Sequence, residues 1–322
     1  MIPIFIGGTG RSGTTILKKV LASNSHVVAM PFELRMVVDP GGALDLVHFL
    51  SNRWSPYNAD IAIHQFKRIA QECAFTSLPW RVVARSLAAI GISPWRYSQV
   101  GIATVVGNKY YRERVGFLLD EVVHDITAGN WTGSFPFQVR SKIYEAGPFE
   151  KAVIAVIVAR FVHDLYCAIP NASVSTHWVE DTPYNLIHAV ELCDLFPDMR
   201  LIHIYRDPRD VLASYRTKIW GGDDVVVIAR RLAGILERWF IIREHLPKEC
   251  FMELALEQLA EGPKEHLARI CEFAGIQCEP AMMDIPLNQV NAGRWLGELS
   301  RTESELILPI LAPYVKQLGY EL

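Results

Sequence analysis

Gly7-Gly8-Thr9-Gly10-Arg11-Ser12-Gly13-Thr14-Thr15 is the stretch around which the rest of the chain is organised. The apolar run Met1 to Ile6 precedes it, and a segment with apolar residues at helical spacing (16–21) follows it. This order predicts a strand, a glycine-rich loop and a helix. Glycines permit positive φ and leave backbone N–H groups unobstructed, and a helix N-terminus attracts negative charge. The stretch is therefore predicted to bind a phosphate or a similar anion.

The loop differs at one position from the phosphate loop of nucleotide hydrolases. That loop has the pattern G-x-x-x-x-G-K-[ST], in which the lysine binds the β/γ-phosphates and the hydroxyl holds Mg²⁺. Gly8 to Thr15 fits the pattern except that Thr14 replaces the lysine. We therefore expect a shorter and less charged group, held by amides, hydroxyls and Arg11, and no transfer of a γ-phosphoryl group. A plain glycine turn that binds nothing is the alternative.

The composition is typical of a globular enzyme. The chain has 322 residues, of which 50% are hydrophobic and 21% are charged. It is long enough to bury a sizeable core, as one large α/β domain or as two smaller ones. The net charge of −3 provides no overall attraction for a polyanion. We expect no nucleic-acid partner.

Nothing in the sequence predicts secretion or a membrane span. Met1 is not followed by a basic region and an apolar stretch, as it would be in a signal peptide. The longest apolar run, Ala152 to Ala159, is too short to cross a bilayer and predicts a buried helix. The six cysteines form no C-x-x-C pair, which indicates thiols in a reducing compartment. We predict a cytoplasmic protein.

The middle of the chain is predicted to be helical. Apolar residues have helical spacing around 43–52, 61–73, 79–90 and 111–127, and no strand pattern alternates with them. Pro56, Pro79 and Pro94 separate these segments. We interpret roughly 40–150 as a helical insertion that supplies an acceptor pocket. Its candidate substrate contacts are Lys109, Arg112, Arg114, Trp131, Arg140, Lys142 and Tyr144. A solvated helix face for the cations and a place in the core for the aromatics are the alternatives.

A second informative segment spans Arg200 to Arg216. A β-rich run stops at Arg206, and Pro208 followed by Asp210 opens a helix. Arg206 is expected to project from the carboxyl end of the strand, with Ser214 two turns into the helix. A guanidinium and a hydroxyl are what a second, separate phosphate needs. A network of arginines and aspartates that caps this strand–helix corner is the alternative.

Together, a phosphate loop without its lysine and an Arg-x7-Ser corner resemble the sulfotransferase family. The pattern is most similar to the branch of protein-tyrosine sulfotransferases and their bacterial relatives. The matching residues are Arg11 to Thr15, Glu33-Leu34-Arg35, Asp181-Thr182-Pro183, Arg206 to Arg209, Val290 to Gly293 with Arg294-Trp295, and Leu318-Gly319-Tyr320. The resemblance implies a single P-loop-like α/β domain over 1–322. Its fold is expected to have three layers, with helices on both sides of a mostly parallel central sheet.

The resemblance also implies a donor and a reaction. The donor is 3′-phosphoadenosine 5′-phosphosulfate, bound by its 5′ end at the first motif and by its 3′-phosphate at the second. The implied donor-binding residues are Arg11, Ser12, Gly13, Thr14, Thr15, Arg206, Ser214, Arg294 and Trp295. Glu33 is the expected base and Arg11 a catalytic cation, and no metal site is expected. The acceptor is the hydroxyl of a small molecule or a peptide, and the oligomeric state is left open.

Departures from the family pattern leave alternatives open. The family's catalytic lysine before Thr-Pro is Asp181 in this chain, so the cation must come from elsewhere, with Arg11 and Arg294 as first candidates. Glu33 can instead form a structural salt bridge with Arg35. At the level of function, the alternatives are an inactive protein that binds adenosine bisphosphate and, less favoured because of Thr14, a P-loop kinase.

Overall fold

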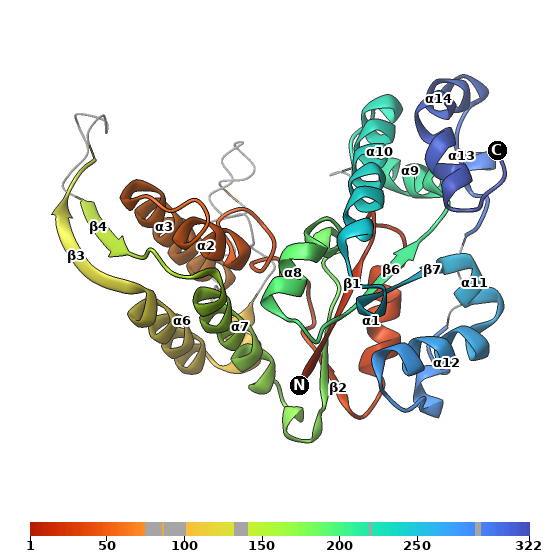
Figure 1. The fold of residues 1–322 in the computed structure, drawn as a ribbon. Coiled ribbons are helices and arrows are strands. Elements are labelled where there is room, and N and C mark those ends of the chain that lie inside the picture. The colour runs from red at the N-terminus through yellow and green to blue at the C-terminus, as the bar shows by residue number, and fades with distance from the viewer. Residues whose placement is uncertain (75–85, 87–100, 132–140, 219–220, 287–290) are drawn as a thin grey trace. The chain divides into compact units, whose positions relative to one another are not determined.

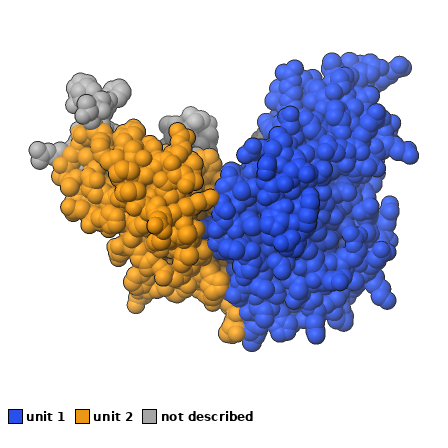
Figure 2. Space-filling view, in the orientation of Figure 1, with its two compact units in different colours: residues 1–29, 174–322 blue, residues 30–173 orange. Residues whose placement is uncertain are grey.

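The computed structural model describes residues 1–74, 86, 101–131, 141–218, 221–286 and 291–322 (Figure 1). The chain divides into two compact units, which are coloured separately in Figure 2. The first unit combines Met1–Ala29 with Val174–Leu322, and the second is Met30–Ser173. The inserted unit is thus longer at both ends than the predicted 40–150. Each unit is described by itself below.

Within the described residues of the first unit, five strands form a parallel sheet. They are β1 (Ile2–Gly7), β2 (Val27–Ala29), β5 (His177–Glu180), β6 (Arg200–Tyr205) and β7 (Phe251–Ala255). Their order is β2-β5-β1-β6-β7, and every pair is parallel. In chain order, β2 and β5 lie on one side of β1, and the later strands β6 and β7 lie on the other side. In open parallel sheets, ligands bind beyond the carboxyl ends of the strands where the strand order changes direction.

Helices connect and cover the strands of this sheet. They are α1 (Thr14–Ala22), α8 (Ala189–Leu195), α9 (Pro208–Arg216), α10 (Val225–Ile242), α11 (Leu256–Glu261), α12 (Pro263–Ala274), α13 (Trp295–Glu298) and α14 (Arg301–Gln317). Side chains alternate between the two faces of a strand, so a strand inside such a sheet can pack against helices on both faces. The predicted α/β fold with a parallel sheet flanked by helices is confirmed.

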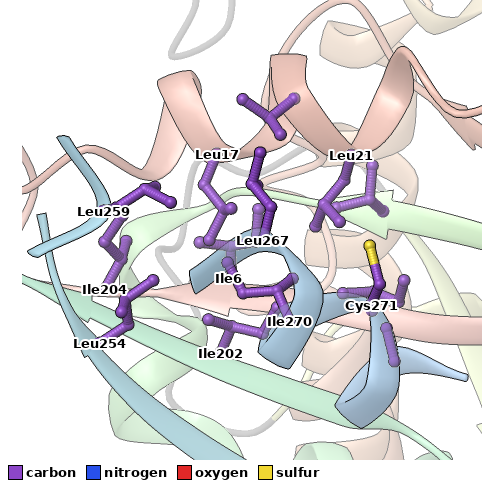
Figure 3. Packing of buried hydrophobic residues seen from close by; sticks show 14 of the residues in the cluster. Ile6, Leu17, Leu21, Ile202, Ile204, Leu254, Leu259, Leu267, Ile270 and Cys271 are labelled. Atoms are coloured by element: carbon purple, nitrogen blue, oxygen red, sulfur yellow. The ribbon is translucent and has the colours of Figure 1, made fainter. Parts of the chain in front are cut away.

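Residues of β1 show this alternation. Ile6 packs with Leu17 and Leu21 of α1 and with Leu267 of α12 in one apolar cluster (Figure 3). Phe5 points to the opposite face, where its ring lies 5.2 Å from that of Trp178. The sheet therefore has an apolar layer on each side of β1.

The second unit contains helices and one hairpin. Its helices include α2 (Ala43–Leu50), α3 (Pro56–Cys73), α5 (Ile102–Val106), α6 (Asn108–Val122) and α7 (Lys151–Cys167). Strands β3 (Val123–Gly129) and β4 (Ser141–Ala146) pair antiparallel. In the part of the chain that the structure describes, no helix has both the length and the apolar character to cross a membrane.

Two predictions for this unit are corrected. The helix predicted over 111–127 ends at Val122, and an all-helical insertion is wrong because β3 follows directly. The run Val122-Val123 and the residues Ile126 and Thr127 are β-branched, which lowers helix propensity and favours strands. The helix predicted over 79–90 lies, apart from residue 86, outside the described residues, as do Pro79 and Pro94.

Candidate functional site

The loop between β1 and α1 has the predicted strand–loop–helix form. Gly10, Arg11 and Gly13 have φ values of 73°, 55° and 107°. Gly13 is the N-cap of α1, and the helix begins at Thr14. The N–H groups of the first helical turn have no acceptor within a helix. The loop therefore presents backbone donors at the carboxyl edge of the central strand.

The glycines of the loop are required by close contacts. A Cβ at Gly8 would lie 2.3 Å from Ser12 Oγ, and one at Gly10 would lie 2.5 Å from the hydroxyl of Tyr215. A Cβ at Gly13 would lie 2.7 Å from a methyl group of Leu256. Ser12 Oγ is fully buried and has no hydrogen-bond partner among the described residues. A buried hydroxyl without a partner suits a bound anion, which would satisfy it.

The structure brings the two predicted motifs together. Arg11 Nε donates a 3.1 Å hydrogen bond to Ser214 Oγ in α9. The Tyr215 hydroxyl donates a 2.8 Å bond to the carbonyl of Thr9. The loop after β1 and the helix after β6 are therefore fastened to each other, although 203 positions separate Arg11 from Ser214.

The corner after β6 also forms the alternative network of arginines and aspartates. Arg206 Nη2 donates to Asp210 Oδ2 at 3.2 Å and to the carbonyl of Asn291. Asp207 caps α9 and accepts bonds from the backbone and the side chain of Arg209. Arg206 Nε is buried, however, and no described residue accepts a hydrogen bond from it. This donor lies 4.0 Å from Glu257 Oε1, too far for a hydrogen bond, so among the described residues the capping network leaves it without a hydrogen-bond acceptor.

Asp210 connects this corner to the turn that holds Arg294 and Trp295. Its Oδ2 accepts from the N–H of Gly293 at 2.8 Å, and its Oδ1 accepts from the N–H of Trp295 at 3.0 Å. The guanidinium of Arg209 lies 4.3 Å from the centroid of the Trp295 ring. Arg294 binds Glu298 through two hydrogen bonds of 2.9 and 2.8 Å. Val290, part of the same motif, lies outside the described residues.

A buried ion pair stands where the family pattern has its lysine. Asp181 follows β5 directly, and its Oδ1 lies 2.6 Å from Lys18 Nζ of α1. The preceding Glu180 is fully buried and accepts bonds from the backbone and hydroxyl of Thr182. Burial and the neighbouring Asp181 raise the pKa of Glu180, against these hydrogen bonds. The sequence analysis missed Lys18, although a lysine one turn after Thr14 within an apolar segment was the available indication.

Glu33 and Arg35 belong to the second unit. Arg35 Nη1 lies 3.7 Å from Glu33 Oε2, and Arg35 Nε donates to Asp39 at 3.0 Å. The side chain of Glu33 is 32% exposed. The salt bridge considered as the structural alternative is therefore formed, and the role of Glu33 as a base stays a prediction.

The predicted acceptor contacts in the second unit have different environments. Trp131 Nε1 donates to the buried Asp60 at 2.8 Å, and the backbone N–H of Tyr144 donates to the same carboxylate. The side chains of Lys109 and Arg112 are exposed, as expected for a solvated helix face. Tyr144 contributes to a cavity of about 500 Å³, which is lined by Lys67, Gly116, Leu119, Asp120, Val123, His124, Asp125, Ile126 and Tyr144.

The other three candidate contacts are Arg114, Lys142 and Arg140. Arg114 pairs with Asp164 at 3.1 Å and lies over the ring of Phe117. The side chain of Lys142 is exposed, and its carbonyl lies 2.8 Å from His64 Nε2. Arg140 lies outside the described residues. Two of the predicted contacts therefore line cavities: Tyr144 the cavity of about 500 Å³, and Arg114 another of about 350 Å³.

Comparison with known proteins finds similarity to one family model and to solved structures. Residues 134–280 match the model of the sulfotransferase family. The fold is similar to the sulfotransferase domain of the olefin synthase from Synechococcus PCC 7002, with a TM-score of 0.52 at 14% identity over 100% of this chain and 95% of that one. It is also similar to the sulfotransferase domain from the curacin biosynthetic pathway, with a TM-score of 0.53 at 14% identity over 99% and 98%. No curated protein matches the chain.

Proposed function

We propose that this chain, whose residues 134–280 match the model of the sulfotransferase family, transfers a sulfuryl group from 3′-phosphoadenosine 5′-phosphosulfate to the hydroxyl of a small molecule or a peptide. The donor supplies a sulfuryl group whose bond to the nucleotide phosphate breaks while a bond to the acceptor oxygen forms, with adenosine 3′,5′-bisphosphate as the leaving group. The residues of this chain bind the donor, orient the acceptor and take up the acceptor's proton.

The first unit fits such a donor on two counts. In the glycine loop, a Cβ at Gly8, Gly10 or Gly13 would meet a close contact, and the hydroxyl of Ser12 is buried without a hydrogen-bond partner among the described residues. At the corner after β6, Arg206 Nε is likewise buried and has no hydrogen-bond acceptor among the described residues. One anion at each place would satisfy a buried polar group that the described protein atoms leave unsatisfied. A nucleotide with phosphates at both ends of its ribose carries two such anions.

We assign the 5′ end of the donor to the loop. The N–H groups around Gly13, the hydroxyls of Ser12, Thr14 and Thr15, and the guanidinium of Arg11 would hold it. Positioning and electrostatic stabilisation of developing charge do most of the catalysis in the related phosphoryl transfers. The fixed backbone donors of the loop supply this stabilisation without reorganisation.

We assign the 3′-phosphate to Arg206 and Ser214, with Arg294 and Trp295 near the same end. Arg206 already has one guanidinium edge fixed by Asp210, so its orientation is set before binding. Ser214 Oγ accepts from Arg11, and its own proton remains available to donate. Arg294 would have to leave Glu298 in order to contact the donor.

We assign the role of base to Glu33. Its carboxylate would take the proton of the acceptor hydroxyl as the new oxygen–sulfur bond forms. General base assistance of this kind typically contributes about 10²- to 10⁴-fold in rate. The assignment rests on the Glu33-Leu34-Arg35 motif, and its test is given below.

The observation that carries the proposal is the hydrogen bond between Arg11 and Ser214, because it joins the two motifs that would bind the two ends of one nucleotide. Calorimetric titration with adenosine 3′,5′-bisphosphate and with Mg²⁺–ATP tests it. We expect the bisphosphate to bind at least about tenfold more tightly. The reverse order would contradict the proposal and favour a kinase.

A non-catalytic nucleotide-binding protein is the second candidate. Asp181 favours it, because a carboxylate stands where the family pattern has a catalytic lysine. Incubation with the sulfated donor and a panel of phenols, sugars and tyrosine peptides separates the two. Sulfated product supports the enzyme, and tight bisphosphate binding without any product supports the binding protein.

A further inference from the structure

The ion pair between Lys18 and Asp181 is almost completely buried. Its atoms lie 2.6 Å apart, and the two side chains are 9% and 1% exposed. Removing two charges from water is costly, and apolar residues of similar volume are often as stable or more stable in place of such a pair. The burial of this pair is therefore weak evidence for a stabilising role, and a role in binding or catalysis would account for it.

The pair lies beside the glycine loop. Asp181 comes directly after β5, and the N–H of Gly8 donates a 3.0 Å bond to the carbonyl of Pro183 two residues later. Lys18 follows Thr14 by four positions, so both are on the same side of α1. Side chains of a helix lean toward its N-terminus. The ammonium group of Lys18 is therefore directed toward the end of α1 at which the anion is expected.

The other cations considered for this place already have partners. Arg11 Nε donates to Ser214, and Arg294 binds Glu298 with two hydrogen bonds. A lysine ammonium has three N–H donors, and Asp181 can accept one or two of them. At least one donor of Lys18 therefore remains for an oxygen of a bound anion.

We propose that Lys18 is the cation that contacts the oxygens of the sulfuryl group, and that Asp181 positions its ammonium. This inference rests on the proposed function. The charge that the family pattern places directly after β5 is delivered in this chain from α1, and a carboxylate takes the vacated position. Lys18 would donate an N–H to the sulfuryl oxygens as negative charge shifts during transfer.

The test compares binding of two nucleotides that differ in the sulfuryl group. The variant Lys18→Met/Asp181→Asn removes both charges and leaves no buried charge unpaired. In calorimetric titrations without an acceptor, we expect its affinity for 3′-phosphoadenosine 5′-phosphosulfate to fall about tenfold, the size of one charge-assisted hydrogen bond. Its affinity for adenosine 3′,5′-bisphosphate is expected to stay within about threefold of the wild type.

One single variant serves as a matched control, and a second tests the role of Asp181. Lys19→Met removes the same charge from the next residue of α1, whose side chain is exposed, and both affinities are expected to stay unchanged. Asp181→Asn keeps the ammonium of Lys18 but removes the carboxylate that positions it, and its affinity for the sulfated nucleotide is expected to lie between those of the wild type and the uncharged variant. A tenfold loss in Lys19→Met would contradict the assignment to Lys18, and a wild-type affinity in Asp181→Asn would contradict the positioning role of Asp181.

Exchange of the two charges gives an independent test. In the variant Lys18→Asp/Asp181→Lys the ammonium comes from the position after β5, as in the family pattern. We expect this variant to bind the sulfated nucleotide at least threefold more tightly than the uncharged variant does. The comparison of these two variants tests the role of the ammonium even if the uncharged variant has a lowered melting temperature, because neither variant is compared with the wild type.

The outcomes separate this inference from the proposed function. A wild-type protein that binds neither nucleotide contradicts the proposed function, and this inference with it. A wild-type protein that binds both, together with an uncharged variant that loses neither affinity or loses both equally, contradicts the role of Lys18 alone. Selective loss of the sulfated nucleotide supports it.

Discussion

The two units use their charged residues in different ways. In the first unit, charged side chains of the motifs are buried and bonded across elements that are far apart in the sequence, as in Lys18–Asp181 and the contacts of Asp210. In the second unit, the candidate acceptor cations Lys109 and Arg114 pair with Glu113 and Asp164 through side chains that are partly or largely exposed. Exposed pairs contribute about 0–1 kcal/mol. The predicted donor site is therefore fixed by buried contacts, whereas these candidate acceptor cations can be exchanged with little effect on the fold.

The largest expected effect comes from a residue of the second unit. Glu33→Gln should lower turnover by about 10²- to 10⁴-fold, because the amide cannot take the acceptor's proton. Binding of adenosine 3′,5′-bisphosphate, measured by calorimetry, should stay within a few-fold. Asp39→Asn, which also breaks a contact of Arg35, is the control. Unchanged turnover in Glu33→Gln would remove this residue from the proposed reaction and leave the proposed chemistry to the first unit alone.

The next effect concerns stability and contrasts one aspartate from each unit. Asp210→Ala should lower the free energy of unfolding by about 3–5 kcal/mol, because it leaves the guanidinium of Arg206 and two backbone N–H groups without their acceptor. Asp164→Ala breaks the pair with Arg114, in which both side chains are 27% exposed, and should cost less than about 1 kcal/mol. Urea unfolding of both variants measures the difference. Equal losses would contradict the contrast between the units.

Acid should act on the first unit through Glu253. Burial raises the pKa of this carboxyl, but hydrogen bonds from His203 and Trp239 and the charge of Arg243 outweigh burial and hold the pKa at about 2. A carboxyl whose pKa is lower in the folded state stabilises the protein above its unfolded pKa of about 4.5, and this contribution is lost as the pH falls toward 2. Burial also lowers the pKa of His203 in the folded protein. As the pH falls below about 6.5, this histidine therefore binds a proton in the unfolded chain before it does so in the folded protein, which lowers the stability of the fold.

The expected loss from Glu253 is on the order of 3 kcal/mol between pH 4.5 and 2. Urea unfolding at a series of pH values measures it. Glu253→Gln should be less stable than the wild type at pH 7 and should show a flatter acid dependence. Glu121→Gln, in an exposed pair of the second unit, should follow the wild-type curve. Parallel curves for wild type and Glu253→Gln would contradict the assignment.

The smallest effect is expected at the exposed cations of the second unit. Arg112→Ala should change the free energy of unfolding by no more than about 0.5 kcal/mol, because its side chain is exposed on α6. Bisphosphate affinity and turnover should also remain at wild-type values. A marked rise in the KM of an acceptor would instead make Arg112 a substrate contact and sharpen the functional boundary between the units.

The sequence predicts best what is local. The strand, loop and helix around Gly7–Thr15 follow from an apolar run, glycines and helical spacing within about 20 residues. The corner at Arg206 is predictable for the same reason, since Pro208 and Asp210 begin a helix directly after a β-rich run. The hairpin β3–β4 was missed because the spacing of 111–127 fits a helix, while β3 is stabilised by pairing with the following strand β4.

The contacts that complete the candidate site could not be predicted in this way. Lys18 and Asp181 lie on different elements, and only the pairing of β1 with β5 brings these elements together. Asp210 bonds to Gly293 and Trp295 across more than 80 positions of sequence. The pattern of one sequence contains no information on which distant polar groups become partners, because packing of the whole sheet determines it.

The sheet also imposes an order on biosynthesis. The central strand β1 is made before every other strand of the sheet, yet its neighbours are β5 and β6, with Ile2 opposite His177 and Ile4 opposite Arg200. At about 5–20 residues per second, the ribosome needs roughly 7–30 s to produce the intervening residues 30–173. The second unit is continuous in the chain and has the time to fold during this delay. The apolar segment 2–6 must wait for its partners meanwhile, so the nascent chain is exposed to aggregation until β5 has emerged.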